Sequence, residues 1–222
     1  MRRLIIIGEG QTEQEFCKDV LYSHFFEKGI IVENPTIKHS NGGIVSWNII
    51  KSEIEMHLVN NEVRVTLLID LYGIKDSHYF PKWKESKAII NKADRMSFIE
   101  KAMLEDIPDN VRYRFIPYIQ LHEFEALLFS EKQVFDDNFE KTEFLDYNYL
   151  QETLRIADPE DINDSPHTAP SKRLERIIKG YKSDSDSLKV FYGSLIAQEI
   201  GLSQIRAKCT RFNKWIGILE KI

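Results

Sequence analysis

The sequence predicts an α/β protein with a mostly parallel sheet flanked by helices and with a helical C-terminal appendage. Two short runs rich in branched residues, Arg3–Gly8 and Val63–Ile69, have the continuous apolar pattern of strands covered on both faces. Segments with helical spacing separate such runs over the first two-thirds of the chain, an alternation typical of parallel sheets. The last third lacks strand patterns. We therefore expect an α/β core over residues 1–145 and a helical appendage over 146–222 packed on it.

Between the two strong strands the pattern predicts three further elements and a turn. Thr12 is a favoured helix N-cap residue, and Glu15 lies three positions on as in a capping box, so a helix is expected from there to about Lys28. A weaker strand interrupted by Pro35, a turn and a second helix are expected next, in this order: Ile30–Lys38, Asn41–Gly43 and Ile44–Leu58.

After the second strong strand the sequence predicts a long loop, a helix, a third strong strand and a segment of helical character: Tyr72–Lys84, Lys92–Asp106, Tyr113–Leu121 and His122–Ser130. In the last third, Tyr147–Ala157 has helical spacing and Asp158–Ser171 is a polar loop. The remainder is expected to form helices with turns at Gly180 and Gly201.

Composition limits the class of protein. Among 222 residues, 42% are hydrophobic and 29% are charged, which is ordinary for a globular chain that buries a core. No run reaches the length of a secretory signal or of a membrane span, and two distant cysteines suit a reducing compartment, so we expect a soluble cytoplasmic protein.

The net charge of −5 argues against a generally basic nucleic-acid coat, but residues 165–222 hold 11 Lys and Arg against 5 Asp and Glu. That tail is interpreted either as a phosphate-contacting surface or as a solvated helical face.

Carboxylates follow each of the three strong strands. Glu9 follows the first, Asp70 the second, and Glu123 and Glu125 the third. If the strands are parallel, these side chains meet at one edge of the sheet, where α/β proteins place their ligand sites. Such a cluster would repel itself without a cation, and Mg²⁺ or Mn²⁺ suits an all-oxygen site. Each acid taken alone is also explained as a helix cap or a turn residue.

Seven segments spread over nearly the whole chain resemble the motifs of one family: Gly8–Glu13, Asp70–Gly73, His122–Phe129, Ile162–Asp164, Ala169–Arg173, Ile200–Leu202 and Cys209–Trp215. The first resembles the EGxTE opening of that family, and the next two resemble its second and third motifs. The family that these segments resemble is domain of unknown function 4276, a divergent Toprim family.

The resemblance implies a Toprim-like core related to OLD-family nucleases, topoisomerases and primases. Carried over, it gives Glu9 the role of acid/base or metal ligand and Asp70 that of metal ligand. Tyr72 stands where the wider group has its second metal-binding Asp. Glu123, Glu125 or Asp76 is then the expected source of the missing oxygen. The resemblance also implies an OLD- or SMC-like ATPase as partner and a role in anti-phage defence.

Basic residues near the C-terminal motifs are candidates for contact with phosphate. Lys172 and Arg173 stand near the start of an expected helix, where cations oppose the helix dipole, and Arg211 lies in a basic, aromatic-containing segment. Lys172 is expected to stabilise charge on the phosphate, and all three are expected to bind nucleic acid. The alternative is that these charges simply face solvent.

Four aromatic residues surround the second motif, and they form either a base-stacking loop or the packing of a long loop: Tyr72, Tyr79, Phe80 and Trp83.

The leading hypothesis is a metal-dependent nuclease with Glu9, Asp70, Glu123 and Lys172 as catalytic residues and Glu9, Asp70, Glu123 and Glu125 as metal ligands. DNA is the default substrate and RNA an alternative. A second hypothesis is a non-catalytic regulatory subunit of an ATPase complex. A third is metal-dependent nucleotidyl or phosphoryl transfer to a small molecule. The sequence has no Walker A motif, so no intrinsic ATPase is expected.

Overall fold

The computed structural model describes residues 1–38, 43–162, 165, 167–182 and 184–222. Its described part contains one sheet of four strands in the order β2-β1-β3-β4, and all neighbouring strands are parallel. The strands are β1 (Arg2–Gly8), β2 (Ile30–Glu33), β3 (Val63–Leu68) and β4 (Phe115–Ile116). The predicted fold class, an α/β protein with a parallel sheet and long C-terminal helices, is confirmed.

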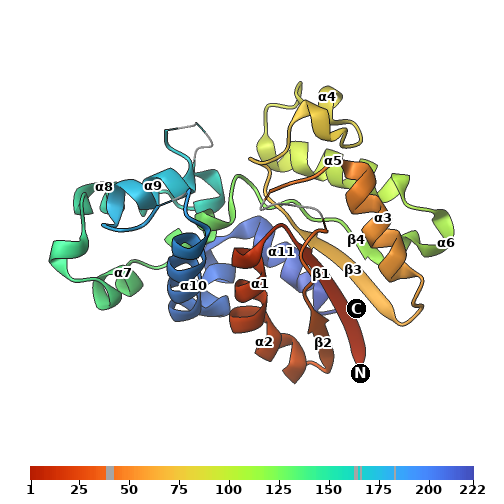
Figure 1. Ribbon diagram of the computed structural model, residues 1–222, viewed down its shortest axis with the longest axis horizontal. Coiled ribbons are helices and arrows are strands. Elements are labelled where there is room, and N and C mark those ends of the chain that lie inside the picture. Colours follow the sequence, from red (N-terminus) through yellow and green to blue (C-terminus); the bar gives the residue numbers. More distant parts are fainter. Residues whose placement is uncertain (39–42, 163–164, 166, 183) are drawn as a thin grey trace.

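Helices cover both faces of the sheet, as Figure 1 shows. Alternate residues of β1 belong to different cores: Leu4 and Ile6 face one apolar cluster, and Ile5 and Ile7 face the other. On the first side lie α1 (Gln11–Phe16), the π-helical turn η1 (Cys17–Leu21) and α2 (Tyr22–Glu27), together with the C-terminal helices. On the second side lie α3 (Trp47–Leu58) and α5 (Lys92–Asp106). This double cover explains why the strands are apolar without alternation.

The third strand is shorter than expected. Only Phe115 and Ile116 pair with β3, whereas the sequence predicted a strand over Tyr113–Leu121. Pro117 follows directly and has no N–H to donate, so the ladder is interrupted there. An isolated parallel bridge between Asp70 and Gln120 restores the pairing beyond the interruption. The segment still runs beside β3 to the carboxyl edge.

The first helix begins earlier than its predicted cap. Its N-cap residue is Gly10, and the side chain of Glu13 accepts a hydrogen bond from the Gly10 N–H at 2.8 Å. Thr12 lies inside the helix, so the expected capping box of Thr12 and Glu15 is wrong. Glycine at position 10 has no side-chain acceptor, which hid this cap from a search for Ser, Thr, Asp or Asn.

The long loop after β3 contains two short helices, η2 (Asp76–His78) and α4 (Trp83–Ser86). After β4 come short helical elements that include η3 (Phe124–Ser130), α7 (Lys132–Asn138), α8 (Tyr147–Thr153) and η5 (Pro159–Asp161). The remaining long helices are α9 (Pro170–Ile177), α10 (Asp186–Lys208) and α11 (Thr210–Leu219), and α6 (Asp109–Arg112) precedes β4. The expected turn at Gly201 is a kink inside α10, where this glycine has a φ of +73°.

The C-terminal helices share one core with the sheet. Phe212 and Trp215 of α11 lie in the same apolar cluster as Leu4 and Phe16. The indole N–H of Trp215 donates to Thr66 Oγ1 of β3 at 2.9 Å, and the Trp215 ring stacks on Tyr118 at a centroid distance of 4.4 Å. The last third of the chain is therefore continuous with the packing that supports the carboxyl edge.

Within the described residues, no helix combines the length and the apolar character needed to cross a membrane. Four residues named in the sequence motifs and turns lie outside the described residues: Asn41, Gly42, Asn163 and Asp164.

Candidate functional site

The carboxyl edge of the sheet brings two predicted site residues together. Gly8 of β1 pairs with Leu68 of β3, and the N–H of Glu9 donates to the carbonyl oxygen of Leu68 at 3.2 Å. The two strands therefore end in register. Glu9 and Asp70 lie at the same edge, as parallel strands require.

Glu9 and Asp70 are also in direct contact. The Asp70 N–H donates to Oε2 of Glu9 at 3.1 Å. Burial raises the pKa of Glu9, while this hydrogen bond and the charge of Lys189 partly oppose the rise. Glu9 is thus a carboxyl group whose proton affinity is increased at a position next to a second acid.

The carboxylate of Asp70 lies within reach of the charges of four other acids. Its Oδ1 atom is buried and has no hydrogen-bond partner among the described residues. Burial, and then the charges of Glu9 and Glu13, raise the pKa of Asp70 well above its usual range. A buried carboxylate oxygen that has no hydrogen-bond partner needs an explanation. Among other acids, a bound cation or a donor group of a ligand would supply the missing partner.

Glu13 is a member of this cluster that was not among the predicted site residues. Burial raises the pKa of Glu13 to about 7, and the charge of Glu9 adds to the rise. Its side chain is aimed back at Gly10 by the hydrogen bond that caps α1. The four-residue spacing from Glu9 at the start of a helix is the signal that could have identified it.

Glu123 and Glu125 are both buried, because Glu123 has an extended backbone just before η3 and only Glu125 lies inside this helix. Glu123 is the N-cap of η3, and its carboxylate accepts hydrogen bonds from the N–H of Ser171 at 2.8 Å and from its hydroxyl at 3.1 Å. Glu125 is 1% exposed in the first turn of η3. Burial and then the charge of Glu125 raise the pKa of Glu123, while the two bonds from Ser171 oppose the rise.

A lysine of α10 reaches Glu125 and thereby brings a positive charge into the cluster. The ammonium of Lys189 lies 3.0 Å from Glu125 Oε1, and Tyr181 donates its hydroxyl to the same oxygen at 3.2 Å. The charge of Glu125 raises the pKa of Lys189 well above its usual range despite burial. The other oxygen of Glu125, Oε2, is buried without a hydrogen-bond partner among the described residues. Nothing in the sequence near Lys189 marked it as a site residue.

The segment that follows Asp70 closes over Glu9. A Cβ atom added at Gly73 would lie 3.3 Å from Glu9 Oε1 and 3.2 Å from Ile44 Cγ2, so any other residue would press on both side chains. The neighbouring Tyr72 donates its N–H to the carbonyl oxygen of His122 at 3.0 Å and exposes 44% of its surface. Tyr72 therefore lies at the rim of the cluster rather than in it.

Asp76, the third expected source of a metal-binding oxygen, is engaged elsewhere. Its Oδ1 accepts the indole N–H of Trp83 at 2.8 Å and also binds Lys87, and its side chain is 57% exposed. These contacts lower the pKa of Asp76, with Lys87 contributing most.

The three predicted phosphate-binding cations have other contacts. Lys172 pairs with Glu175 one turn along α9 at 2.8 Å and is 43% exposed. The guanidinium of Arg173 donates to Thr168 O and Thr153 Oγ1. Arg211 forms a largely buried ion pair with Glu100 at 2.7 Å. Among the described residues, Lys189 of α10 is a cation whose charge opposes the rise in pKa of Glu9, Glu13 and Glu123.

His122 has an unusual backbone. It is 2% exposed, and its φ of +67° places a non-glycine residue in the left-handed region. Such a conformation costs on the order of 1–3 kcal/mol and is found most often at functional sites. Its carbonyl oxygen anchors Tyr72, and the next residue is Glu123, so this geometry turns the chain from the sheet edge into the cluster.

The acids gathered at this edge offer carboxylate oxygens, which suit a hard divalent ion such as Mg²⁺ or Mn²⁺. Within the described residues, no three His, Cys, Asp or Glu side chains are arranged to hold a metal ion together. Mg²⁺ is commonly held by one or two carboxylates while it keeps waters. The buried orphan oxygens Asp70 Oδ1 and Glu125 Oε2 fit that requirement.

Comparison with known proteins gives one result. The model of a family described as "Domain of unknown function (DUF4276)" matches residues 8–220, a range that includes every acid of the cluster and Lys189. No curated protein and no solved structure matches the chain. The chain therefore belongs to the DUF4276 family.

Proposed function

We propose that the protein is a metal-dependent nuclease that hydrolyses phosphodiester bonds at the carboxyl edge of its sheet. The observation that carries the proposal is the meeting of acids from three separate segments, two of which have a buried carboxylate oxygen with no hydrogen-bond partner among the described residues. A cluster of this kind is costly for a fold to maintain, because the charges of neighbouring acids raise the pKa values of Glu13 and Asp70. Perturbed acids gathered at the carboxyl ends of parallel strands favour catalysis over a structural role.

The residues of the cluster divide into three tasks. Asp70 and Glu125 offer oxygens that can hold a divalent ion, and Glu123 is fixed by Ser171 beside them. When bound, such an ion supplies Lewis-acid polarisation of a phosphate oxygen and makes a neighbouring water easier to deprotonate. Glu9 has a raised pKa and so is suited to accept a proton from an attacking water and to return one to the leaving oxygen.

Lys189 is the side chain best placed to oppose negative charge at this site. Its ammonium is held inside the cluster by Glu125, whereas Lys172 pairs on the surface of α9. Fixed cations in water-poor surroundings stabilise the charge that develops on phosphate more strongly than exposed ones. We therefore assign to Lys189 the stabilising role first expected of Lys172. The Toprim-like core that the sequence resemblance implies supports the same class of reaction.

A second candidate function is a non-catalytic subunit of an ATPase complex. The ion pair of Lys189 with Glu125 favours it, because a built-in ammonium already balances part of the negative charge. Tyr72 in place of a second metal-binding Asp points the same way. An OLD- or SMC-like ATPase would then be the partner.

The proposal is tested by cleavage of end-labelled DNA and RNA with the purified chain in Mg²⁺ or Mn²⁺. Wild type, Asp70→Asn, Glu9→Gln and the control Asp109→Asn are compared, because Asp109 is an exposed acid paired with Arg112 away from the cluster. We expect cutting by wild type and by the control, and a loss of at least about 100-fold in both cluster variants.

Equal cutting by all four proteins would place the activity outside this site and contradict the proposal. No cutting of either nucleic acid, with and without an added ATPase partner, would favour the non-catalytic function. The nucleic acid that is cut separates DNA from RNA.

A further inference from the structure

Four aromatic residues lie in the segment between Asp70 and α5, and the structure divides them into two kinds. Phe80 and Trp83 are 3% and 7% exposed and belong to the core. Phe80 packs against Trp47 with a centroid distance of 5.7 Å, and Arg95 lies 4.6 Å from the centroid of the Trp83 ring. Tyr72 and Tyr79 are 44% and 74% exposed. Packing of the segment thus accounts for only two of the four rings.

Tyr72 is held at the rim of the carboxylate cluster from two sides. It lies two residues after Asp70, and its N–H is bonded to the carbonyl oxygen of His122, which directly precedes Glu123. The next residue, Gly73, packs against the carboxylate of Glu9. The backbone of Tyr72 is therefore fixed beside the acids that would act on phosphate, and its ring is exposed there.

The same segment carries a local excess of positive charge. Residues 71–92 contain five lysines against two acids, although the whole chain has a net charge of −5. Four of these lysines have exposed side chains: Lys75, Lys82, Lys84 and Lys87. Such lysines can contact the phosphates of a nucleic-acid strand, and the exposed tyrosines among them can stack on its bases. The lysines also offset the repulsion between these phosphates and the acidic cluster.

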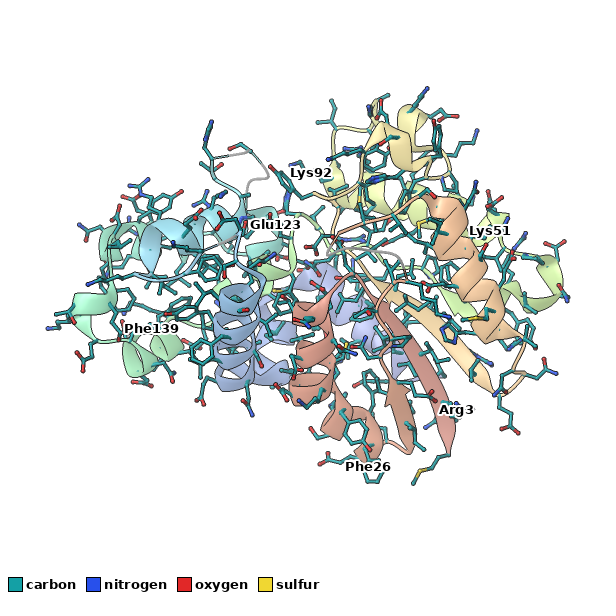
Figure 2. The ribbon with its side chains drawn as sticks, in the orientation of Figure 1. Arg3, Phe26, Lys51, Lys92, Glu123 and Phe139 are labelled. Carbon is teal, nitrogen blue, oxygen red and sulfur yellow. The ribbon has the colours of Figure 1, made fainter. Side chains whose placement is uncertain are left out.

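A cavity adjoins this rim. It has a volume of about 280 Å³ and is lined by the start of α5, the end of the segment that follows β4 and the end of η5: Asn91, Lys92, Ala93, Leu121, His122 and Asp161. Figure 2 labels Lys92 and Glu123 in the upper centre of the molecule, where the strands end. A cavity beside His122 and Lys92 can accept one nucleotide turned out of line, which a single strand provides without the loss of base pairs.

We infer that this site takes a single-stranded nucleic acid, with bases stacked on Tyr72 and Tyr79 and phosphates beside the lysines of residues 71–92. The inference rests on the proposed nuclease function and names its substrate class. Stacking on exposed rings requires a free base face, and paired duplex bases present none along the strand. The same lysines would contact the phosphates of DNA or of RNA. These residues therefore recognise whether the strand is paired, and not which sugar it contains.

The test is fluorescence anisotropy with a labelled single-stranded oligonucleotide and with the duplex of the same sequence, in Ca²⁺, with the oligonucleotide checked for integrity afterwards. Tyr72→Ala and Tyr79→Ala are compared with Tyr22→Ala and Tyr113→Ala. Tyr22 is 44% and Tyr113 is 71% exposed, so each control removes an equally exposed ring elsewhere. Tyr72→Phe keeps the ring and removes only the hydroxyl.

We expect the single strand to bind at least about ten-fold more tightly than the duplex. Tyr72→Ala and Tyr79→Ala should each weaken single-strand binding roughly ten-fold, while Tyr72→Phe and both controls should bind as wild type does. Equal or tighter duplex binding, absence of binding, or alanine variants that bind like wild type would overturn the inference. Tyrosine-dependent binding without cleavage in Mg²⁺ or Mn²⁺ would instead keep the single-strand site and reject the nuclease.

Discussion

The N–H of Asp70 donates a hydrogen bond to the carboxylate of Glu9 at 3.1 Å, so the two acids at the ends of neighbouring strands are joined through one backbone amide. The bond satisfies Glu9 Oε2, whereas Asp70 Oδ1 is buried with no hydrogen-bond partner in the described part of the chain. The same hydrogen bond that stabilises the Glu9 carboxylate thus places Asp70 close to the negative charge of Glu9. Stability and function are expected to be in opposition at this pair.

Asp70→Asn should stabilise the metal-free protein while it removes activity. The neutral amide has no charge for Glu9 and Glu13 to repel, and it can donate hydrogen bonds to them. We expect a gain of about 1–2 kcal/mol at pH 8, seen as a rise of several degrees in Tm by differential scanning fluorimetry in EDTA. Mg²⁺ should raise the Tm of wild type and not of the variant. A lower Tm for Asp70→Asn in EDTA would show that this acid contributes to folding.

Lys189→Met should destabilise the fold because it leaves Glu125 charged without its ion-pair partner. Breaking a fully buried pair costs about 3–5 kcal/mol, and the 28% exposure of Lys189 reduces the expected loss to roughly 2–3 kcal/mol. Urea unfolding at pH 8 measures it. The double variant Lys189→Met with Glu125→Gln should recover most of the loss, since both charges are then gone. An additive double variant would mean that the two side chains do not interact.

The pH dependence of stability should contain a component from Glu160. Burial, and then the charge of Asp158, raise the pKa of Glu160 to about 7. Between its usual pKa of 4.5 and 7 the folded state holds a proton that the unfolded state has lost, so stability falls as pH rises through this window. The full effect is about 3 kcal/mol. Because pH 5 already lies inside this window, the unfolding free energies at pH 5 and pH 8 should differ by roughly 2.5 kcal/mol less in Glu160→Gln than in wild type, and equal differences would refute the assignment.

Gly73→Ala should impair the site more than the fold. Its new Cβ would press on Glu9 Oε1 and Ile44 Cγ2, and the carboxylate end is the more easily displaced of the two. We expect roughly ten-fold slower cleavage with a loss of stability near 1 kcal/mol. Gly217→Ala is the matched control, because a Cβ there meets no atom within 4 Å and alanine favours the interior of α11. Unchanged cleavage by Gly73→Ala would mean that Glu9 can move without consequence.

The sequence predicts those parts of the fold that depend on local pattern. The strands β1 and β3 and the helix α5 follow from apolar periodicity, and the acids at the strand ends follow from the parallel sheet. The predicted length of the third strand was wrong because Pro117 interrupts the hydrogen-bond ladder with β3. The residues beyond Pro117 are still mostly apolar, so the pattern gave no sign of the interruption. The cap of α1 was wrong because a backbone N–H of Gly10 replaces the usual side-chain oxygen.

The candidate site was only partly accessible to such reasoning. Glu9, Asp70, Glu123 and Glu125 were named from their places after strands, and the structure brings Glu9 and Asp70 into contact. Lys189 and Tyr181 are brought to Glu125 by the tertiary packing of α10 and of the segment before it, and no local pattern encodes that contact. Whether these residues bind metal or nucleic acid stays a prediction.

Ser171 donates hydrogen bonds to Glu123, and Tyr181 and Lys189 bind Glu125. These contacts limit where the chain can be divided. The acids come from residues 1–145, and their neutralising and orienting partners come from residues 146–222. A shortened chain that keeps only the sheet would retain the negative charges and lose these partners. Engineering of this site, or its transfer to another scaffold, therefore has to move both halves together.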